Sequence, residues 1–252
     1  TPAGSVQIIR EINTEMLRML PKESIILWPW EIKGPIEGPA VMFDVLAASH
    51  NIIYLSQKAK RLFAVTKNSV FDALERYPDA VLIGEVEDPH LYAKLKDKFI
   101  SDNAPSRVLA ADVSGRDVVL ITNNGTHTLS ELIDHGANPV IVGHWINIDA
   151  VVAYIRRQKG HRIHLVPSGG RDKVFENIGG KLMEDWYCAE ATRDLLRGQA
   201  RDFENDIRQS REFINSVAPQ DEDELLLILR LNSTNVVPLC YPISSGIIEV
   251  KA

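Results

Sequence analysis

Acidic and polar side chains follow several apolar runs of this sequence, at points where parallel strands would end. Asp44 closes the run VMFD, and TNNGT at residues 122–126 follows VVLI. Asn147 follows VIVGHWI, and SGGR at residues 168–171 follows HLVP. Ligands of open parallel sheets bind beyond the carboxyl ends of the strands, where helix N-termini present unpaired amides. We therefore expect these segments to converge on one site.

The TNNGT segment is open to two interpretations. In the structural one, Gly125 takes a positive φ and Thr126 caps the next helix, so that no ligand is needed. In the functional one, amides of the turn and the hydroxyls of Thr122 and Thr126 hold a phosphate or a carboxylate. Neither GxGxxG nor GxxxxGK[ST] occurs here, so the turn alone favours the structural interpretation. The same choice applies to SGGR, where Arg171 could bind an oxyanion through both arms of its guanidinium.

Three acidic residues are candidate metal ligands. A carboxylate at the end of an apolar strand is costly to bury without a partner, so Asp44 should meet a cation, a helix cap or a metal. Glu184 and Asp185 are adjacent at the start of an expected helix. That position suits stabilisation by the helix dipole as well as Mg²⁺ coordination, and the residues alone favour the dipole.

The histidines and the potential nucleophiles give weaker indications of a functional site. His161 and His164 fall on opposite faces of an expected strand, so they cannot share a metal there. His50 and His127 directly follow two candidate site segments and could line the site, although a surface position is the commoner outcome. Neither HExxH nor GxSxG occurs, so zinc-protease chemistry and covalent catalysis by a nucleophilic serine have no specific support.

The elements that must position these residues alternate along the chain. The expected strands are 25–28, 41–46, 61–66, 80–83, 117–122, 139–143 and 162–167, and the expected helices are 49–60, 68–76, 126–135, 148–158, 183–197 and 200–216. Between Gly84 and Asp117 we expect a partly helical excursion and a loop around residues 102–106. The tail, residues 222–250, should form a short helix or strand followed by edge strands around Val236 and Ile247. This rhythm predicts an α/β fold with a mostly parallel sheet, helices on both faces and a site at the carboxyl ends of the strands.

Residues 5–20 place Ile8, Ile12 and Met16 at helical spacing before Pro21. We therefore expect residues 1–22 to form an N-terminal helical extension and residues 23–252 an α/β domain. Whether that domain has two lobes with a boundary near residue 115 is left open, as is whether the extension covers the sheet or a partner subunit.

Composition narrows the class of protein. The chain has 252 residues, of which 45% are hydrophobic and 25% charged, and its net charge is -6, so no basic surplus points to nucleic acid. The apolar runs are far shorter than the roughly 20 residues that a membrane span needs, and no signal-peptide pattern is seen. Cys188 and Cys240 are far apart and form no CxxC pair. We expect a cytoplasmic protein that binds a small anionic substrate and neither nucleic acid nor membrane; a homo-oligomer is left open.

Taken in order, these segments resemble the 2-phosphosulfolactate phosphatase family, Mg²⁺-dependent enzymes associated with coenzyme M biosynthesis. The similarity runs from Ile25 to Pro238. The family segments DVLRATTT, GNSP, TTNGT, GSFLNA, CAG and EDxxCAG are similar, respectively, to residues 44–50, 102–105, 122–126, 143–148, 167–169 and 184–190. The resemblance implies hydrolysis of a phosphate ester of a small 2-hydroxy acid.

The resemblance also implies a role for each candidate residue. Asp44 and Asn124 are expected to be catalytic, and Asp44, Glu184 and Asp185 are expected to bind Mg²⁺. The expected substrate-binding residues are Asn103, Thr122, Asn124, Gly125, Thr126, Asn147, Ser168, Gly169 and Arg171.

This chain departs from the family pattern within the expected site. Ala47 stands where DVLRATTT has arginine, and Asp102 and Ala104 stand where GNSP has glycine and serine. Loss of a phosphate-facing arginine should cost orders of magnitude in rate unless Arg171, Arg107 or His50 replaces it. Three alternatives stay open: an altered substrate, another reaction on an organophosphate, or a non-catalytic relative that binds a small anion or serves as a subunit of an assembly.

Overall fold

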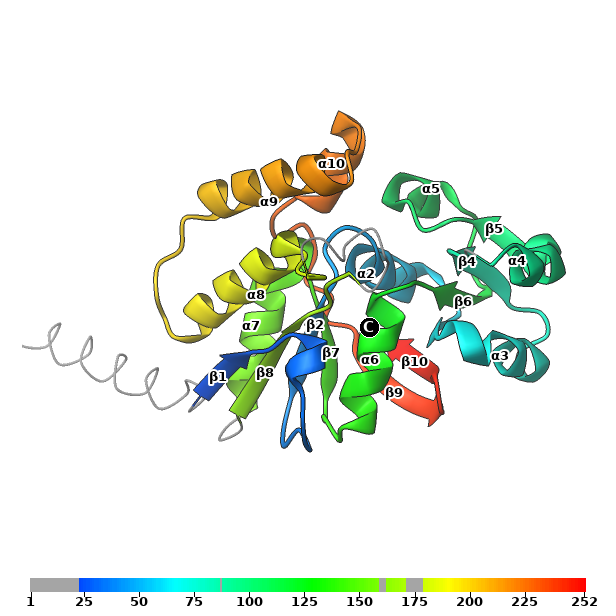
Figure 1. Ribbon diagram of the computed structural model, residues 1–252, viewed down its shortest axis with the longest axis horizontal. Coiled ribbons are helices and arrows are strands. Elements are labelled where there is room, and N and C mark those ends of the chain that lie inside the picture. Colours follow the sequence, from blue (N-terminus) through cyan, green and yellow to red (C-terminus); the bar gives the residue numbers. More distant parts are fainter. Residues whose placement is uncertain (1–22, 87, 159–161, 171–178) are drawn as a thin grey trace, which may run out of the picture.

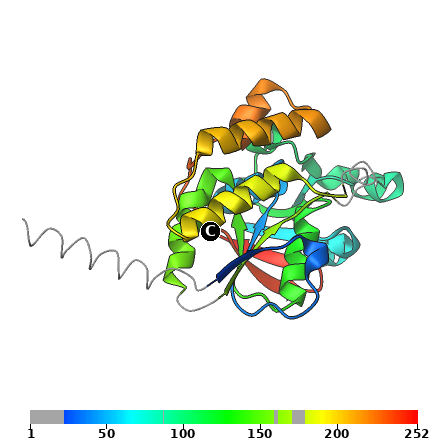
Figure 2. The same cartoon turned by 60° about the vertical axis from the view of Figure 1, so that its left-hand side comes forward.

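A computed structural model describes residues 23–252 except 87, 159–161 and 171–178. The described residues form one ten-stranded sheet with helices on both faces (Figures 1 and 2), which confirms the predicted α/β class. The helix expected over residues 5–20 and the candidate ligand Arg171 lie outside the described residues.

The elements follow one another in the predicted alternation. The strands are β1 (Glu23–Ile26), β2 (Ala40–Phe43), β3 (Arg61–Val65), β4 (Val81–Gly84), β5 (Phe99–Ser101), β6 (Asp117–Ile121), β7 (Val140–Gly143), β8 (Arg162–Pro167), β9 (Leu239–Ser244) and β10 (Ile247–Lys251). The α-helices are α2 (Ala48–Lys58), α3 (Val70–Arg76), α4 (Pro89–Leu95), α5 (Pro105–Ala110), α6 (Gly125–Asp134), α7 (Ile148–Arg157), α8 (Met183–Leu196), α9 (Phe203–Val217) and α10 (Glu222–Ile228). Short 3-10 helices are η1 (Pro29–Glu31), η2 (Lys67–Ser69), η3 (Lys96–Lys98) and η4 (Trp145–Asn147). None of these helices is long and apolar enough to cross a bilayer, within the part of the chain that the structure describes.

The sheet consists of two parallel halves joined by an antiparallel hairpin. Its strand order is β1-β8-β2-β7-β9-β10-β3-β6-β4-β5. Pairing is parallel within β1-β8-β2-β7 and within β3-β6-β4-β5, and it is antiparallel where β9 and β10 connect the two halves. The sheet is therefore mostly parallel, as predicted.

The position of the C-terminal hairpin corrects the sequence prediction. Strands at the edge of the sheet were expected around Val236 and Ile247, but β9 and β10 lie in its middle and Val236 is in neither. Polar and exposed residues in β9, including Pro242, are typical of an edge strand. They are tolerated here because β9 pairs with β7 only at Leu239 and Cys240, so Pro242 lies beyond that ladder.

The segment from Gly84 to Asp117 holds more structure than its charge pattern indicates. It contains α4 and η3, as the expected helical excursion requires, but also β5 and α5. The strand β5 is only three residues long and forms the edge of the sheet beside β4. So short a strand leaves no recognisable alternation of apolar residues in the sequence.

Alternate residues of each strand pack on opposite faces of the sheet. Ala40 and Met42 of β2 belong to a core cluster with α2, α5 and α6, whereas Val41 and Phe43 pack with α7 and α8. In the other half of the sheet, that second face is covered by α3 and α4. This double covering explains why the strands are apolar throughout rather than alternating with polar residues.

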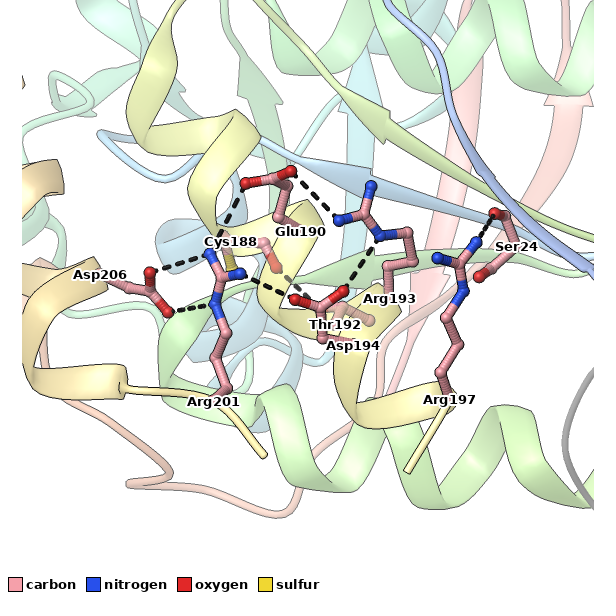
Figure 3. A network of polar contacts seen from close by, with 9 residues as sticks. All are labelled: Ser24, Cys188, Glu190, Thr192, Arg193, Asp194, Arg197, Arg201 and Asp206. Carbon is pink, nitrogen blue, oxygen red and sulfur yellow. Dashed lines mark hydrogen bonds and ion pairs between the residues drawn. The ribbon is translucent and has the colours of Figure 1, made fainter. Parts of the chain in front are cut away.

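An ion-pair network fixes α9 against α8 (Figure 3). Arg201, in the connection between them, donates to both oxygens of Asp206 at 2.6 and 2.9 Å and to Asp194 at 2.8 Å. Glu190 lies 3.6 Å from the same guanidinium. Because Asp206 is only 4% exposed, its charge requires such a partner. The network therefore sets the path of α9 toward α10 and the carboxyl edge of the sheet.

Candidate active site

A cleft of about 340 Å³ lies at the carboxyl ends of the strands, where the sequence analysis places the site. Its walls come from the segments that follow β2, β4, β5 and β6, and from the start of α5. The described residues that line it are Asp44, Leu46, Ala47, Glu85, Asn103, Ala104, Pro105, Arg107, Thr122, Asn123, Asn124, Leu182 and Gln220. Of the predicted site residues, Asp44, Asn103, Thr122 and Asn124 are thus brought together.

Asp44 follows the last residue of β2 and turns back onto the start of α2. Its Oδ1 accepts the amide hydrogen of Ala48 at 3.3 Å, and its own amide donates to Ser49 Oγ at 2.9 Å. Burial raises the pKa of Asp44 to about 6, with a further contribution from the charge of Glu85. The carboxylate is therefore held in place by backbone amides while it carries a charge that its surroundings disfavour.

The turn that follows β6 does not have the conformation that the structural interpretation of TNNGT predicts. Gly125 has no positive φ; it is the first residue of α6, and Asn124 rather than Thr126 takes the N-cap position. The Thr126 amide donates to Thr122 Oγ1 at 3.1 Å, and the Thr126 hydroxyl donates to the Thr122 carbonyl oxygen at 2.8 Å. Thr122 and Thr126 therefore stabilise the turn by hydrogen bonding to each other.

Glycine is required at position 125 by close packing. A Cβ at Gly125 would lie 2.4 Å from the Cβ of Ala48 and 2.9 Å from Oδ2 of Asp44. Such distances are well below van der Waals contact, so glycine allows the first turns of α2 and α6 to meet beside the Asp44 carboxylate. Gly125 and Thr126 are not among the residues that line the cleft; their role in binding substrate stays a prediction.

Glu184 is the most unusual of the three predicted metal ligands, and neither it nor Asp185 is among the residues that line the cleft. Glu184 is fully buried at the start of α8, and neither carboxylate oxygen has a hydrogen-bond partner among the described residues. Burial raises the pKa of Glu184 to about 8, and the nearby charge of Asp44 acts in the same direction. A buried carboxylate without a partner requires either a proton or a cation.

Asp185 holds three segments together. Its Oδ1 accepts the amide hydrogen of Val45 at 2.7 Å, and its Oδ2 accepts that of Gly169 at 3.1 Å. These bonds tie the start of α8 to the segments after β2 and β8. Burial, followed by the charges of Glu184 and Asp44, raises the pKa of Asp185 well above its usual range.

These three carboxylates fit a divalent cation in their chemistry. Each of them is buried. The charge of Asp44 raises the pKa of Glu184 and of Asp185, and the charge of Glu184 also raises the pKa of Asp185. Within the described ranges, no three His, Cys, Asp or Glu side chains are already arranged around one point as metal ligands. Mg²⁺ is commonly bound by one or two carboxylates together with water and a substrate phosphate, so a complete protein cage is not needed. The unpartnered oxygens of Glu184 are the donors that fit best.

Two predicted substrate-binding side chains make internal contacts instead of lining the cleft. The Asn147 side chain donates to the carbonyl oxygens of Val142 and Val236 at 3.1 and 2.9 Å and accepts the His144 amide at 2.9 Å. Ser168 is buried, and its hydroxyl donates to Thr128 Oγ1 at 2.9 Å. These bonds make Asn147 and Ser168 part of the frame, and any further contact with substrate stays a prediction.

The two histidines near the β2 loop are buried and neutral. His144 Nε2 donates to the Val45 carbonyl oxygen at 2.9 Å, while its Nδ1 accepts the Ile146 amide at 3.2 Å. Burial lowers the pKa of His144 to about 3, and burial also lowers the pKa of His50, whose ring centroid lies 5.8 Å away. Neither His50 nor His127, the other candidate site-lining histidine, lines the cleft.

Three cleft residues were missed by the sequence analysis: Glu85, Leu182 and Gln220. Glu85 directly follows β4, so the strand-end rule that selected Asp44 would have found it too. Leu182 precedes α8 and Gln220 lies between α9 and α10. No local pattern identifies these two, because they reach the cleft only through the packing of distant helices.

Comparison with known proteins agrees with this geometry. The family model described as 2-phosphosulpholactate phosphatase matches residues 29–236, which include the strand-end segments from Asp44 to Asp185. This chain belongs to the 2-phosphosulfolactate phosphatase family. The resemblance inferred from the sequence motifs is thus confirmed, and the family is one of phosphoric ester hydrolases by its name.

The individual relatives are distant but cover much of the chain. A probable 2-phosphosulfolactate phosphatase of Thermoplasma acidophilum is 30% identical over 65% of this chain and 67% of its own length. Proteins of the same description from Thermoplasma volcanium and Caldicellulosiruptor saccharolyticus are 26% and 27% identical, over 79% and 74% of this chain and 87% and 74% of their own lengths. The 2-phosphosulfolactate phosphatase family therefore accounts for most of this chain.

Proposed function

We propose that this protein catalyses Mg²⁺-dependent hydrolysis of a phosphate ester of a small 2-hydroxy acid. The observation that carries the proposal is the buried, unpartnered carboxylate of Glu184 beside Asp44, in a chain of the 2-phosphosulfolactate phosphatase family. Asp44, Glu184 and Asp185 would hold the cation. Bound there, Mg²⁺ would polarise the phosphoryl group and orient or activate the attacking water.

The polar groups of the cleft would position the substrate. Asn103 and Asn124 line the cleft from different segments of the chain, and carboxamide side chains can donate to phosphate and carboxylate oxygens. The Asn103 backbone is itself held, since its carbonyl oxygen accepts Asn51 Nδ2 at 2.7 Å. In the reaction, water adds to phosphorus, the ester P–O bond breaks, and the alcohol oxygen leaves with a proton.

Asp185 would act on this chemistry through its two backbone bonds as well as through its charge. By holding the Val45 and Gly169 amides, it keeps the loops after β2 and β8 fixed relative to α8. Fixed loops keep Asp44 and Glu184 at a constant separation, which is the preorganisation that electrostatic catalysis requires.

The test is release of inorganic phosphate from 2-phospholactate and 2-phosphosulfolactate, with MgCl₂ or with EDTA, by the wild type and by Asp44→Asn. We expect Mg²⁺-dependent turnover of at least one ester and a loss of at least 100-fold in kcat/KM in the variant, as for removal of a strong electrostatic contact. Glu212→Gln, which alters an exposed carboxylate of α9, is the matched control and should retain wild-type turnover. Equal rates in Asp44→Asn and the wild type would exclude Asp44 as a ligand, and turnover unaffected by EDTA would exclude the cation.

A further inference from the structure

Acidic side chains outnumber basic ones in the described lining of the cleft. Asp44 and Glu85 contribute carboxylates, and Arg107 is the sole cation among the lining residues that the structure describes. Besides Asp44, the loop before α2 contributes only the apolar side chains of Leu46 and Ala47. Among the described lining residues, positive charge for an anionic substrate therefore comes from Arg107 of α5.

Arg107 is paired with Asp102 at the rim. Its Nε donates to Asp102 Oδ1 at 2.8 Å, and its second arm lies 2.8 Å from Oδ2, so that the guanidinium fork meets both oxygens of one carboxylate. The two side chains are 68% and 43% exposed. A fork that already fits one carboxylate in this way will fit another of the same shape.

The backbone that carries Arg107 is fixed independently of this ion pair. The amide of Ser106 donates to both carboxylate oxygens of Glu224 in α10, at 3.1 and 3.3 Å. Asp102 Oδ1 also accepts the Ala104 amide at 3.1 Å. The start of α5 thus stays in place when the guanidinium changes partner.

We propose that Arg107 releases Asp102 and binds the carboxylate of the substrate in its place. An exposed ion pair contributes little to stability because water solvates both charges, so breaking the pair with Asp102 costs little free energy. The guanidinium can then form the same two-armed contact with the substrate carboxylate. Asp102 is the positioning residue that holds the guanidinium at the rim of the cleft before the substrate binds. The inference rests on the proposed function and names its substrate class: phosphate monoesters of a monocarboxylic acid.

The test compares two esters that differ only in the group that Arg107 would bind. These are 2-phospholactate and isopropyl phosphate, in which a methyl group replaces the carboxylate. We expect Arg107→Gln to raise the KM for 2-phospholactate at least 30-fold with kcat within threefold, and to change the KM for isopropyl phosphate less than threefold. The control Arg208→Gln removes an arginine that is similarly exposed and ion-paired, but lies on α9 away from the cleft lining, and should change neither KM.

Two further variants separate a binding role from a structural one. Arg107→Lys keeps the charge but loses the fork, so it should recover part of the affinity. Asp102→Asn keeps the Oδ1 acceptor for Ala104 and removes the competing charge, so it should lower the KM for 2-phospholactate at least twofold. An equal effect of Arg107→Gln on both esters, or no effect of Asp102→Asn, would overturn the proposal.

Calorimetric titration of 2-phospholactate in the presence of Mg²⁺ distinguishes failure of this inference from failure of the proposed function. Binding that weakens at least 30-fold in Arg107→Gln without turnover in any variant would retain the role of Arg107 and reject the phosphatase. Turnover with unchanged binding in Arg107→Gln would retain the phosphatase and reject the role of Arg107. Absence of binding to the wild type would overturn the inference outright.

Discussion

Replacing Glu184 by glutamine should stabilise the protein when no cation is present. Burial raises the pKa of this carboxyl from 4.5 to about 8. Because one pH unit corresponds to about 1.36 kcal/mol, holding the ionised side chain in the folded state costs about 5 kcal/mol above pH 8. Glutamine has the same shape and carries no charge, so it should remove most of this cost.

The pH dependence follows from the direction of the pKa change. Between pH 4.5 and 8 the folded protein holds the Glu184 proton and the unfolded chain does not, so the free energy of unfolding falls as pH rises, by about 1.4 kcal/mol per pH unit. The difference between Glu184→Gln and the wild type should therefore be small at pH 5, grow with pH, and level off above pH 8. Taking this difference cancels the titrating groups whose pKa does not depend on the charge of Glu184, such as His144.

The measurement is urea unfolding at pH 5, 7 and 9, in EDTA and in 10 mM MgCl₂. In EDTA at pH 9 we expect the variant to exceed the wild type by several kcal/mol, whereas the exposed-site control Glu212→Gln should lie within about 1 kcal/mol of it. Mg²⁺ should stabilise the wild type and leave Glu184→Gln almost unchanged, because binding to the folded state alone raises stability. A difference that does not vary with pH, or equal stabilisation of both proteins by Mg²⁺, would refute this reasoning.

Three other changes have expected outcomes. Gly125→Ala places a Cβ 2.4 Å from that of Ala48, so we expect about 1–3 kcal/mol lower stability and at least tenfold lower kcat/KM; unaltered kinetics would contradict the packing argument. Burial lowers the pKa of His144 to about 3, so its contribution to stability is lost as pH falls below about 6.5, by up to about 1.4 kcal/mol per pH unit; urea unfolding of His144→Gln from pH 4.5 to 6.5 should show this slope reduced by one proton. Arg201→Ala leaves the buried Asp206 unpaired and should lower the free energy of unfolding by about 2–4 kcal/mol, against at most about 1 kcal/mol for the exposed Arg208→Ala, with thermal unfolding as the readout.

The frame of the site is predictable because it depends on local patterns. Apolar runs ended by a polar residue located β2 and β6, and the rule that parallel strands present their carboxyl ends together brought Asp44 to the Thr122 turn. The predicted strand 162–167 coincides with β8. Each of these inferences needs only the residues within one element and its end.

The remainder depends on pairing between distant residues, which local patterns do not encode. The central position of β10 is set by its pairing with β3, and the sequence of its partner β9 is typical of an edge. Asn147 has a side chain that could bind a ligand, yet its carboxamide forms hydrogen bonds with the backbone of residues 142, 144 and 236. Gln220 reaches the cleft from the connection between α9 and α10, and α9 is in turn fixed against α8 by the network around Arg201.

The balance of charge in the site links these observations to function. Asp44, Glu184 and Asp185 are buried, and of these only Asp44 lines the cleft, where Glu85 adds a second carboxyl group. In the described lining, Asp44 and Glu85 are opposed only by Arg107, which is already paired with Asp102. An anionic substrate entering such a cleft is repelled unless protons or a cation neutralise the carboxylates. Under the proposed function, a divalent cation held by Asp44, Glu184 and Asp185 would neutralise this charge and allow a phosphate ester to bind.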